Sequence, residues 1–331
     1  MKAVLKPGLK VLHAVAGENS SLERKLRRRY RQRKSERIVR HQDADGREMA
    51  GEDFVYAESL VPGDRRGIYL RGGCDLPAMF RCVPMIRPDL RGSVCMLKQG
   101  NGISDARSDL LLQGLEGVPP ELTAEVTERL HLAPGYFSDD LFAPTFTVPM
   151  APMLGEFKKD VVVLSMGPNL VRTLYRHREH GFLVDPGGWW LNQSMDKVID
   201  NLDNAKWFSK TFESIGKMSL DQFRRDTGRL VQEIKQRTGA HVLMFNVLDL
   251  EPGNTTHSYR YLTSRHLFRL REFPAALSSL AHELDFQVVD VDHVVKGAGA
   301  GNHIDFAHFP SELEEPVARE ALRALTSLGL F

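Results

Sequence analysis

A carboxylate and a histidine stand three residues apart near the C-terminus, in the segment Asp305-Phe-Ala-His308. A carboxylate at this spacing can accept the imidazole Nδ1–H, which fixes the tautomer and leaves Nε2 free to take a proton from a nucleophile. Ser165 directly follows the apolar run 161–164, where a strand would deliver a nucleophile to the edge of a sheet. The three residues predict acyl chemistry by a serine nucleophile, a histidine base and an orienting carboxylate.

Residues at the same predicted strand ends could complete such a site. The first N–H groups of a helix that starts after Ser165 would favour the negative charge that develops on an acyl oxygen. Glycines and side-chain amides at comparable positions are our further candidates for oxyanion or substrate contacts: Gly167, Asn169, Gly188, Asn192 and Asn246.

Histidines and carboxylates between residues 290 and 308 form a possible metal-ligand set of Asp290, Asp292, His293, His303, Asp305 and His308. Donors of this kind bind zinc or manganese. Carboxylates at strand ends more often cap loops, and no cysteine is near, so we expect neither a metal nor another cofactor. The glycine-rich stretch 297–301 lacks the following helix that a phosphate-binding loop needs, and we interpret it as a flexible loop.

The elements that must position these residues alternate between strand and helix from residue 157 onward. Apolar runs predict strands at 161–164, 182–184, 241–245 and 286–291. A helix is expected between the first two, carrying Leu170, Leu174, Arg172 and Arg176 at helical spacing. The arginines on it could bind a phosphate, although we favour a solvated face. The alternation predicts a parallel sheet covered by helices on both faces, with chemistry at the carboxyl ends of its strands.

Helix boundaries are signalled in this half by two capping boxes. Ser219 with Gln222 and Ser311 with Glu314 each have the spacing at which a side chain and a backbone N–H satisfy each other at a helix start. Gly239 is expected to end the first of these helices, and another helix is predicted to run from Pro274.

The first half of the chain has a different pattern. Short β-rich runs at 54–56, 67–70, 80–83 and 93–97 are bounded by glycine, proline and aspartate, and one helix is predicted near 119–132. We therefore expect three parts: a basic N-terminal arm at 1–50, a β-rich accessory domain at 51–155 and an α/β domain at 156–331.

Composition limits the class of protein. The chain has 331 residues, 42% of them hydrophobic and 26% charged, which is typical of a globular protein. No apolar run approaches the ~20 residues of a membrane-spanning helix. Three cysteines without a CxxC spacing cannot form a disulfide framework, which favours a cytoplasmic location.

The net charge of +1 hides a strongly basic segment. Residues 21–40 carry ten Lys or Arg and two Glu, so this arm is +8 and the rest of the chain is −7. Such a segment could bind an anionic partner such as nucleic acid or lipid headgroups. We favour the alternative that it is a solvated helix, or one that packs on the acidic body of its own protein or of a second subunit. The candidate contact residues are Arg27, Arg28, Arg29, Arg31, Arg33 and Lys34.

The serine after a strand, the alternating order and the terminal Asp305-Phe-Ala-His308 resemble the SGNH/GDSL hydrolases. Within that superfamily, Ser165-Met-Gly167 followed by Leu174 and Gly181-Phe182 is similar to the GSCFA-type branch. The resemblance covers about 157–328. It implies a flavodoxin-like three-layer fold and an esterase or acyl transferase that acts on O-acyl esters, often of carbohydrates or lipids, without a metal.

The resemblance also implies roles for three residues: Ser165 as nucleophile, His308 as general base and Asp305 as its orienter. The alternative is a catalytically inactive relative, which would serve as a binding or assembly module and use its basic arm to engage an anionic partner.

Overall fold

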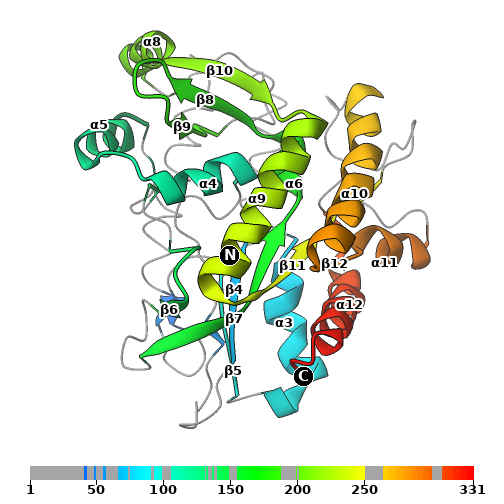
Figure 1. Ribbon diagram of the computed structural model, residues 1–331. Helices are drawn as coiled ribbons and strands as arrows, with labels where there is room; N and C mark the ends of the chain where they lie inside the picture. Colours follow the sequence, from blue (N-terminus) through cyan, green and yellow to red (C-terminus); the bar gives the residue numbers. More distant parts are fainter. Residues whose placement is uncertain are drawn as a thin grey trace, which may run out of the picture.

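The computed structural model shows a mixed α/β protein (Figure 1) and describes residues 41–42, 48–49, 55–56, 66–73, 75–90, 93–98, 106–130, 132, 136–137, 140–148, 155–187, 199, 201–249, 264–299 and 308–331. The basic arm at 27–34 lies outside these residues. In the described part, no helix is long and apolar enough to cross a membrane.

The centre of the molecule is a sheet with the strand order β12-β11-β7-β4-β5-β3. Its five parallel strands are β4 (Arg66–Arg71), β5 (Val94–Lys98), β7 (Glu156–Ser165), β11 (His241–Phe245) and β12 (Gln287–Val289). Numbered along the chain, these five have the order 2-1-3-4-5, which is the flavodoxin-like arrangement. The expected fold class is therefore confirmed.

Two short strands are antiparallel to this sheet. β3 (Val55–Tyr56) pairs with β5 at one edge, and β6 (Thr145–Thr147) pairs with the first half of β7. β7 alternates buried and exposed side chains where it pairs with β6 and is continuously buried from Val161 onward, where it lies between β4 and β11. A strand covered on both faces is expected to be continuously apolar, as this segment is.

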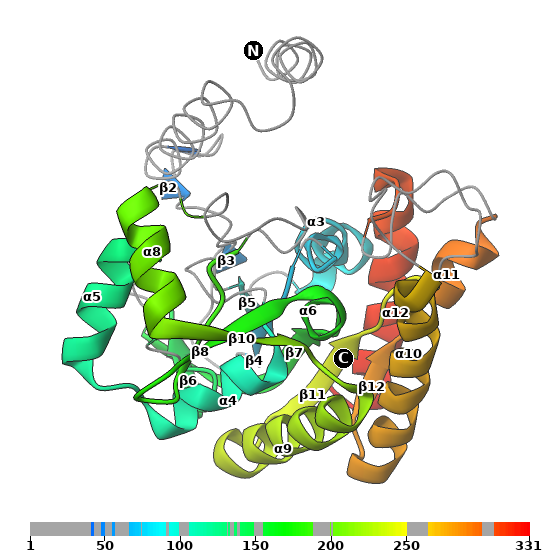
Figure 2. The ribbon, with the colours of Figure 1, turned by 90° about the horizontal axis from the view of Figure 1, so that it is seen from above.

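Helices cover both faces of the sheet (Figure 2). α3 (Pro77–Ile86) packs against α12 (Glu314–Ser327) on one face, and α4 (Ser108–Glu116) and α10 (Ser264–Leu284) pack against α9 (Leu220–Thr238) on the other. α11 (Val291–Gly297) follows β12 and contacts α12.

The sheet crosses the boundary that we expected between residues 155 and 156. β4 and β5 belong to the predicted accessory domain, yet β4 is hydrogen-bonded along its length to β7. The main hydrophobic core also takes buried side chains from both sides of that position, such as Ile68, Met79 and Val163. The parts of the chain before and after residue 155 form one core, because each contributes only some of the strands of the same sheet.

One predicted strand in this region is wrong. Residues 80–83 lie within α3, where Ala78, Met79, Cys82 and Val83 are buried. These positions recur at three- and four-residue spacing and so form one helical face, which packs on α12.

A second, smaller sheet has the order β10-β8-β9 and is entirely antiparallel. β8 (Thr173–His177), β9 (Leu183–Val184) and β10 (Phe212–Lys217) enclose a separate core together with α5 (Pro120–Leu130) and α8 (Leu202–Thr211). Figure 1 shows this unit at the end of the molecule toward which β7 points.

This sheet corrects the predicted helix at 170–175. A helix is present only as α6 (Gly167–Val171), because the backbone becomes extended at Arg172 and residues 173–177 then pair with β10. Arg172 and Arg176 are therefore not neighbours on a helix face. Arg172 instead forms an ion pair with Asp185 at 3.1 Å.

The two predicted capping boxes differ in outcome. Ser219 accepts a hydrogen bond from the backbone N–H of Gln222 at 3.1 Å, and Gly239 ends α9 in the left-handed conformation (φ 69°), as predicted. Ser311 instead begins a 3₁₀ turn, and α12 starts at Glu314 without a side-chain cap.

Candidate active site

The carboxyl ends of β4 and β7 define the point where the strand order reverses. From β4 the chain moves to β5 on one side, and it then returns to β7 on the other side of β4. The connections leaving two such strands diverge to opposite sides, which opens a crevice at the sheet edge where α/β proteins bind ligands. The residues just after β4 and at the end of β7 therefore lie where a ligand is expected to bind.

Ser165 is the last residue of β7 and lies at this point. Its hydroxyl donates a hydrogen bond to Oδ1 of Asp75 at 2.7 Å, and its Oγ accepts one from the backbone N–H of Gly73 at 3.3 Å. Ser165 is 7% exposed and Asp75 is 8% exposed. The segment after β4 thus supplies a carboxylate and an N–H to one serine oxygen.

Gly72 permits this close approach. A Cβ at this position would lie 1.9 Å from Ser165 Oγ and 2.7 Å from the Cδ1 of Leu76. No real Cβ tolerates such distances, so the contact requires a residue without a side chain.

Asn169 lies on α6, two residues after Gly167, and is 2% exposed. Its Oδ1 accepts a hydrogen bond from the backbone N–H of Ser108 at 2.8 Å, at the start of α4. This bond makes the oxygen of the amide the acceptor toward α4, so that Nδ2 remains as the donor end of the side chain.

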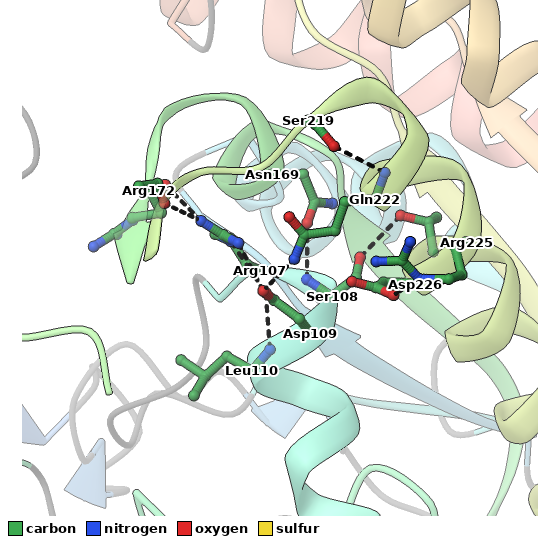
Figure 3. Close-up of polar contacts among 12 residues, drawn as sticks. Arg107, Ser108, Asp109, Leu110, Asn169, Arg172, Ser219, Gln222, Arg225 and Asp226 are labelled. Atoms are coloured by element: carbon green, nitrogen blue, oxygen red, sulfur yellow. Dashed lines mark hydrogen bonds and ion pairs between the residues drawn. The ribbon is translucent and has the colours of Figure 1, made fainter. Parts of the chain in front are cut away.

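Arg107 joins α4 to the segment after α6 and to the small sheet (Figure 3). Its guanidinium is fully buried and donates to both carboxylate oxygens of Asp109, at 3.0 and 2.6 Å, and to the carbonyls of Arg172 and Gly216, at 3.2 and 2.7 Å. Asp109 also accepts a hydrogen bond from Gln222 on α9 at 3.0 Å. The cluster holds the small sheet against the α4–α9 side of the central sheet.

Asp185 continues this polar connection beyond β9. Its backbone N–H donates to the hydroxyl oxygen of Tyr136 at 2.7 Å, and its carboxylate pairs with Arg172. Burial, followed by the negative charge of Asp185, raises the pKa of Tyr136 well above its usual value, so this phenol stays protonated.

Asn246 follows β11, as predicted, but both ends of its amide are engaged within the protein. Nδ2 donates to Asp290 at 2.8 Å and Oδ1 accepts from the N–H of Val291 at 2.8 Å. Asp290 also caps α11 by accepting from the N–H of His293. These residues connect the ends of β11 and β12.

The remaining predicted site residues are only partly described. His308 is half-buried and lies three residues before the 3₁₀ turn at Ser311–Leu313 that leads into α12, whereas Asp305, Gly188 and Asn192 lie outside the described residues. Within the described part of the chain, the hydrogen bonds of the Ser165 side chain are to Asp75 and Gly73, and His308 is not a partner. Among the residues described, no group of His, Cys, Asp and Glu is arranged to hold a metal ion.

Sequence reasoning missed Asp75, Gly72 and Gly73. A signal was present: two glycines and an aspartate follow the apolar run 68–70, the same pattern of strand followed by polar turn that drew attention to Ser165. The pattern does not by itself indicate that this turn lies beside Ser165, because the pairing of β4 with β7 joins segments that are far apart in the chain.

Comparison with known proteins finds no matching family model and no matching curated protein. Solved structures do match over most of the chain. A mutant of Axe2, an acetyl-xylooligosaccharide esterase from Geobacillus, is 12% identical, with 80% of this chain and 96% of that chain covered and a TM-score of 0.41. A lipase/acylhydrolase from Enterococcus faecalis is 11% identical, with 80% and 96% covered and a TM-score of 0.39.

TesA is 13% identical, with 80% of this chain and 99% of that chain covered and a TM-score of 0.36. The fold class is established by the strand order of this chain itself.

Proposed function

We propose that this protein is a serine esterase or O-acyl transferase whose nucleophile is Ser165. The observation that carries the proposal is the position of Ser165 Oγ at the reversal point of a 2-1-3-4-5 sheet, between a buried carboxylate and a backbone N–H. A hydroxyl held in this way has an acceptor for its proton and a fixed orientation. The substrate class is an O-acyl ester, and the SGNH resemblance favours an ester of a carbohydrate or a lipid.

In this proposal, Ser165 attacks the acyl carbonyl and forms an acyl-enzyme, which water or a second alcohol then resolves. His308, oriented by Asp305, serves as general base. The oxyanion would be stabilised by Nδ2 of Asn169, whose orientation is supported by the bond from Ser108 to Oδ1. Gly167, Gly188 and Asn192 stay candidates for substrate contacts, whereas Asn246 is engaged by Asp290 and Val291.

The test combines turnover of p-nitrophenyl acetate with labelling by a fluorophosphonate, which forms a stable bond to an activated serine. We expect the wild type to turn over the ester and to carry the label on the peptide that contains Ser165. Ser165→Ala should abolish both. Cys74→Ala, a change between the two residues that contact Ser165, is the matched variant and should retain both.

Label that persists in Ser165→Ala, or that is lost in Cys74→Ala, would overturn the assignment of the nucleophile. A wild type that neither turns over ester nor takes the label would favour the binding module. In that case, deletion of residues 1–40 should abolish retention on heparin at physiological salt while leaving the fold intact, because the charge of the arm would carry the interaction.

A further inference from the structure

The hydroxyl of Ser165 has one proton, which it donates in a hydrogen bond to Asp75. The 2.7 Å distance from Oγ to Oδ1 is that of a good hydrogen bond between a hydroxyl and a charged acceptor. This contact bears on the proposed function because the base of the first chemical step must be within reach of the proton it removes.

Three features make the contact a fixed part of the fold. Ser165 ends β7 and Asp75 lies four residues after β4, and these two adjacent parallel strands are in register from Ile68 to Arg71, which brings their carboxyl ends together. Gly72 leaves room for the contact, since a Cβ at this position would lie 1.9 Å from Ser165 Oγ. Gly73 donates to the same Oγ and so fixes the direction in which the hydroxyl proton points.

Burial of the pair favours proton transfer. Both residues are less than 9% exposed, so little water competes with the hydroxyl for the carboxylate. Oδ1 of Asp75 is therefore placed to accept a proton from the hydroxyl group that it already contacts.

We propose that Asp75 is the base of the acylation step, which leaves His308 to activate the water of deacylation. The Oγ–H bond of Ser165 breaks, its proton moves to Asp75, and Oγ bonds to the ester carbonyl carbon while the carbonyl π pair moves to oxygen. Collapse of this intermediate breaks the bond to the alcohol, which leaves with the proton from Asp75. His308 then takes a proton from the attacking water and returns it to Oγ as the acid leaves.

This inference rests on the proposed function and divides the base role within it. Its test uses the full chain and three variants: Asp75→Asn, His308→Gln and, as a matched control, Asp89→Asn. Asp89 is an exposed carboxylate that pairs with Arg87, away from the site. The readouts are the rate of fluorophosphonate labelling, which reports nucleophilic attack by Ser165 without a deacylation step, and p-nitrophenol release, which separates a first turnover from steady state.

We expect Asp75→Asn to slow labelling by about 100-fold, the usual contribution of a general base. His308→Gln should be labelled within about threefold of the wild-type rate. It should release about one equivalent of p-nitrophenol and then turn over about 100-fold more slowly, because acyl-enzyme accumulates. Asp89→Asn should match the wild type in both assays.

Asp75→Asn labelled at the wild-type rate, or His308→Gln left unlabelled, would overturn the inference and assign both steps to His308. The labelling of His308→Gln tests the inference even if Asp75→Asn does not fold. Thermal unfolding would reveal such a loss of folding. A wild type without label would instead contradict the proposed function itself, so the two failures can be told apart.

Discussion

A Cβ on Gly72 would lie 1.9 Å from the Oγ of Ser165, so the turn after β4 touches the end of β7 with no room for a side chain. The same turn brings Gly73 and Asp75 to the serine oxygen. The sheet edge where ligand chemistry is expected is thus built from two segments that are far apart in the chain.

The first prediction follows from that contact. Gly72→Ala should lower the free energy of unfolding by about 1–3 kcal/mol, the usual cost of overpacking, and should reduce labelling of Ser165. Gly228→Ala is the matched change: its Cβ would lie 3.6 and 3.7 Å from Leu280 and Leu284, at ordinary contact distance inside α9. It should stabilise the protein by about 0.5–1 kcal/mol. Urea denaturation measures both, and equal effects would contradict the close approach at Gly72.

The second prediction concerns the buried guanidinium of Arg107. Arg107→Met should lower the free energy of unfolding by about 3–5 kcal/mol, because it leaves the carboxylate of Asp109 without its buried partner. Arg107→Lys should not restore stability, since one ammonium cannot reach the four acceptors that the planar fork serves.

Arg225→Met is the control for that change. Arg225 is 68% exposed and pairs with Asp226 at the surface of α9, so its loss should change the free energy of unfolding by less than about 1 kcal/mol. Chemical denaturation of the three variants would show whether the Arg107 cluster stabilises the fold. A small effect of Arg107→Met would mean that the small sheet is held by other contacts.

The third prediction compares the two serines with capping-box spacing. Ser219→Ala should cost about 1 kcal/mol, because the N–H of Gln222 loses its acceptor at the start of α9. Ser311→Ala should cost less than about 0.5 kcal/mol, since this serine begins a 3₁₀ turn and makes no cap. Thermal unfolding of the pair provides the check, and a reversed order would contradict the helix starts described above.

The fourth prediction is a pH dependence from Lys217. Burial, and then the positive charge of Arg269, lower the pKa of Lys217 from its usual 10.5 to about 8. Between these values the unfolded chain binds the proton and the folded chain does not, so this group makes stability rise as the pH increases from about 8 to 10.5. Lys217→Met should remove that rise. Unfolding curves of both proteins across this range would test it, and parallel pH profiles would contradict the shift.

The fifth prediction concerns the boundary at residue 155. A fragment of residues 156–331 keeps β7, β11 and β12 but lacks β4, so one side of β7 loses its hydrogen-bonded partner and its packing. We expect this fragment to unfold without a cooperative transition, whereas a chain beginning at residue 41 should unfold like the full protein. Calorimetry distinguishes the two cases, and a sharp transition in the fragment would restore the expected domain division.

Local signals in the sequence predicted the parts of the fold that depend on neighbouring residues. The buried run at 161–164, the strand at 241–245 and the Ser219–Gly239 boundaries of α9 were predicted correctly. Each depends on apolar continuity or on hydrogen bonds within a few residues, and such patterns can be read from a single segment. The strand–helix alternation likewise predicted a parallel sheet with helices on both faces.

Only the tertiary structure decided which segments meet. The 173–177 stretch could form either a helix or a strand by its residue types, and its pairing with β10 selected the strand. Asp75 lies 90 positions before Ser165, and nothing in the local pattern of either indicates that one strand is placed beside the other. The sequence by itself therefore determined the elements and pointed to Ser165, whereas the order of strands in the sheet, set by packing between distant segments, determined that Asp75 and Gly73 contact it.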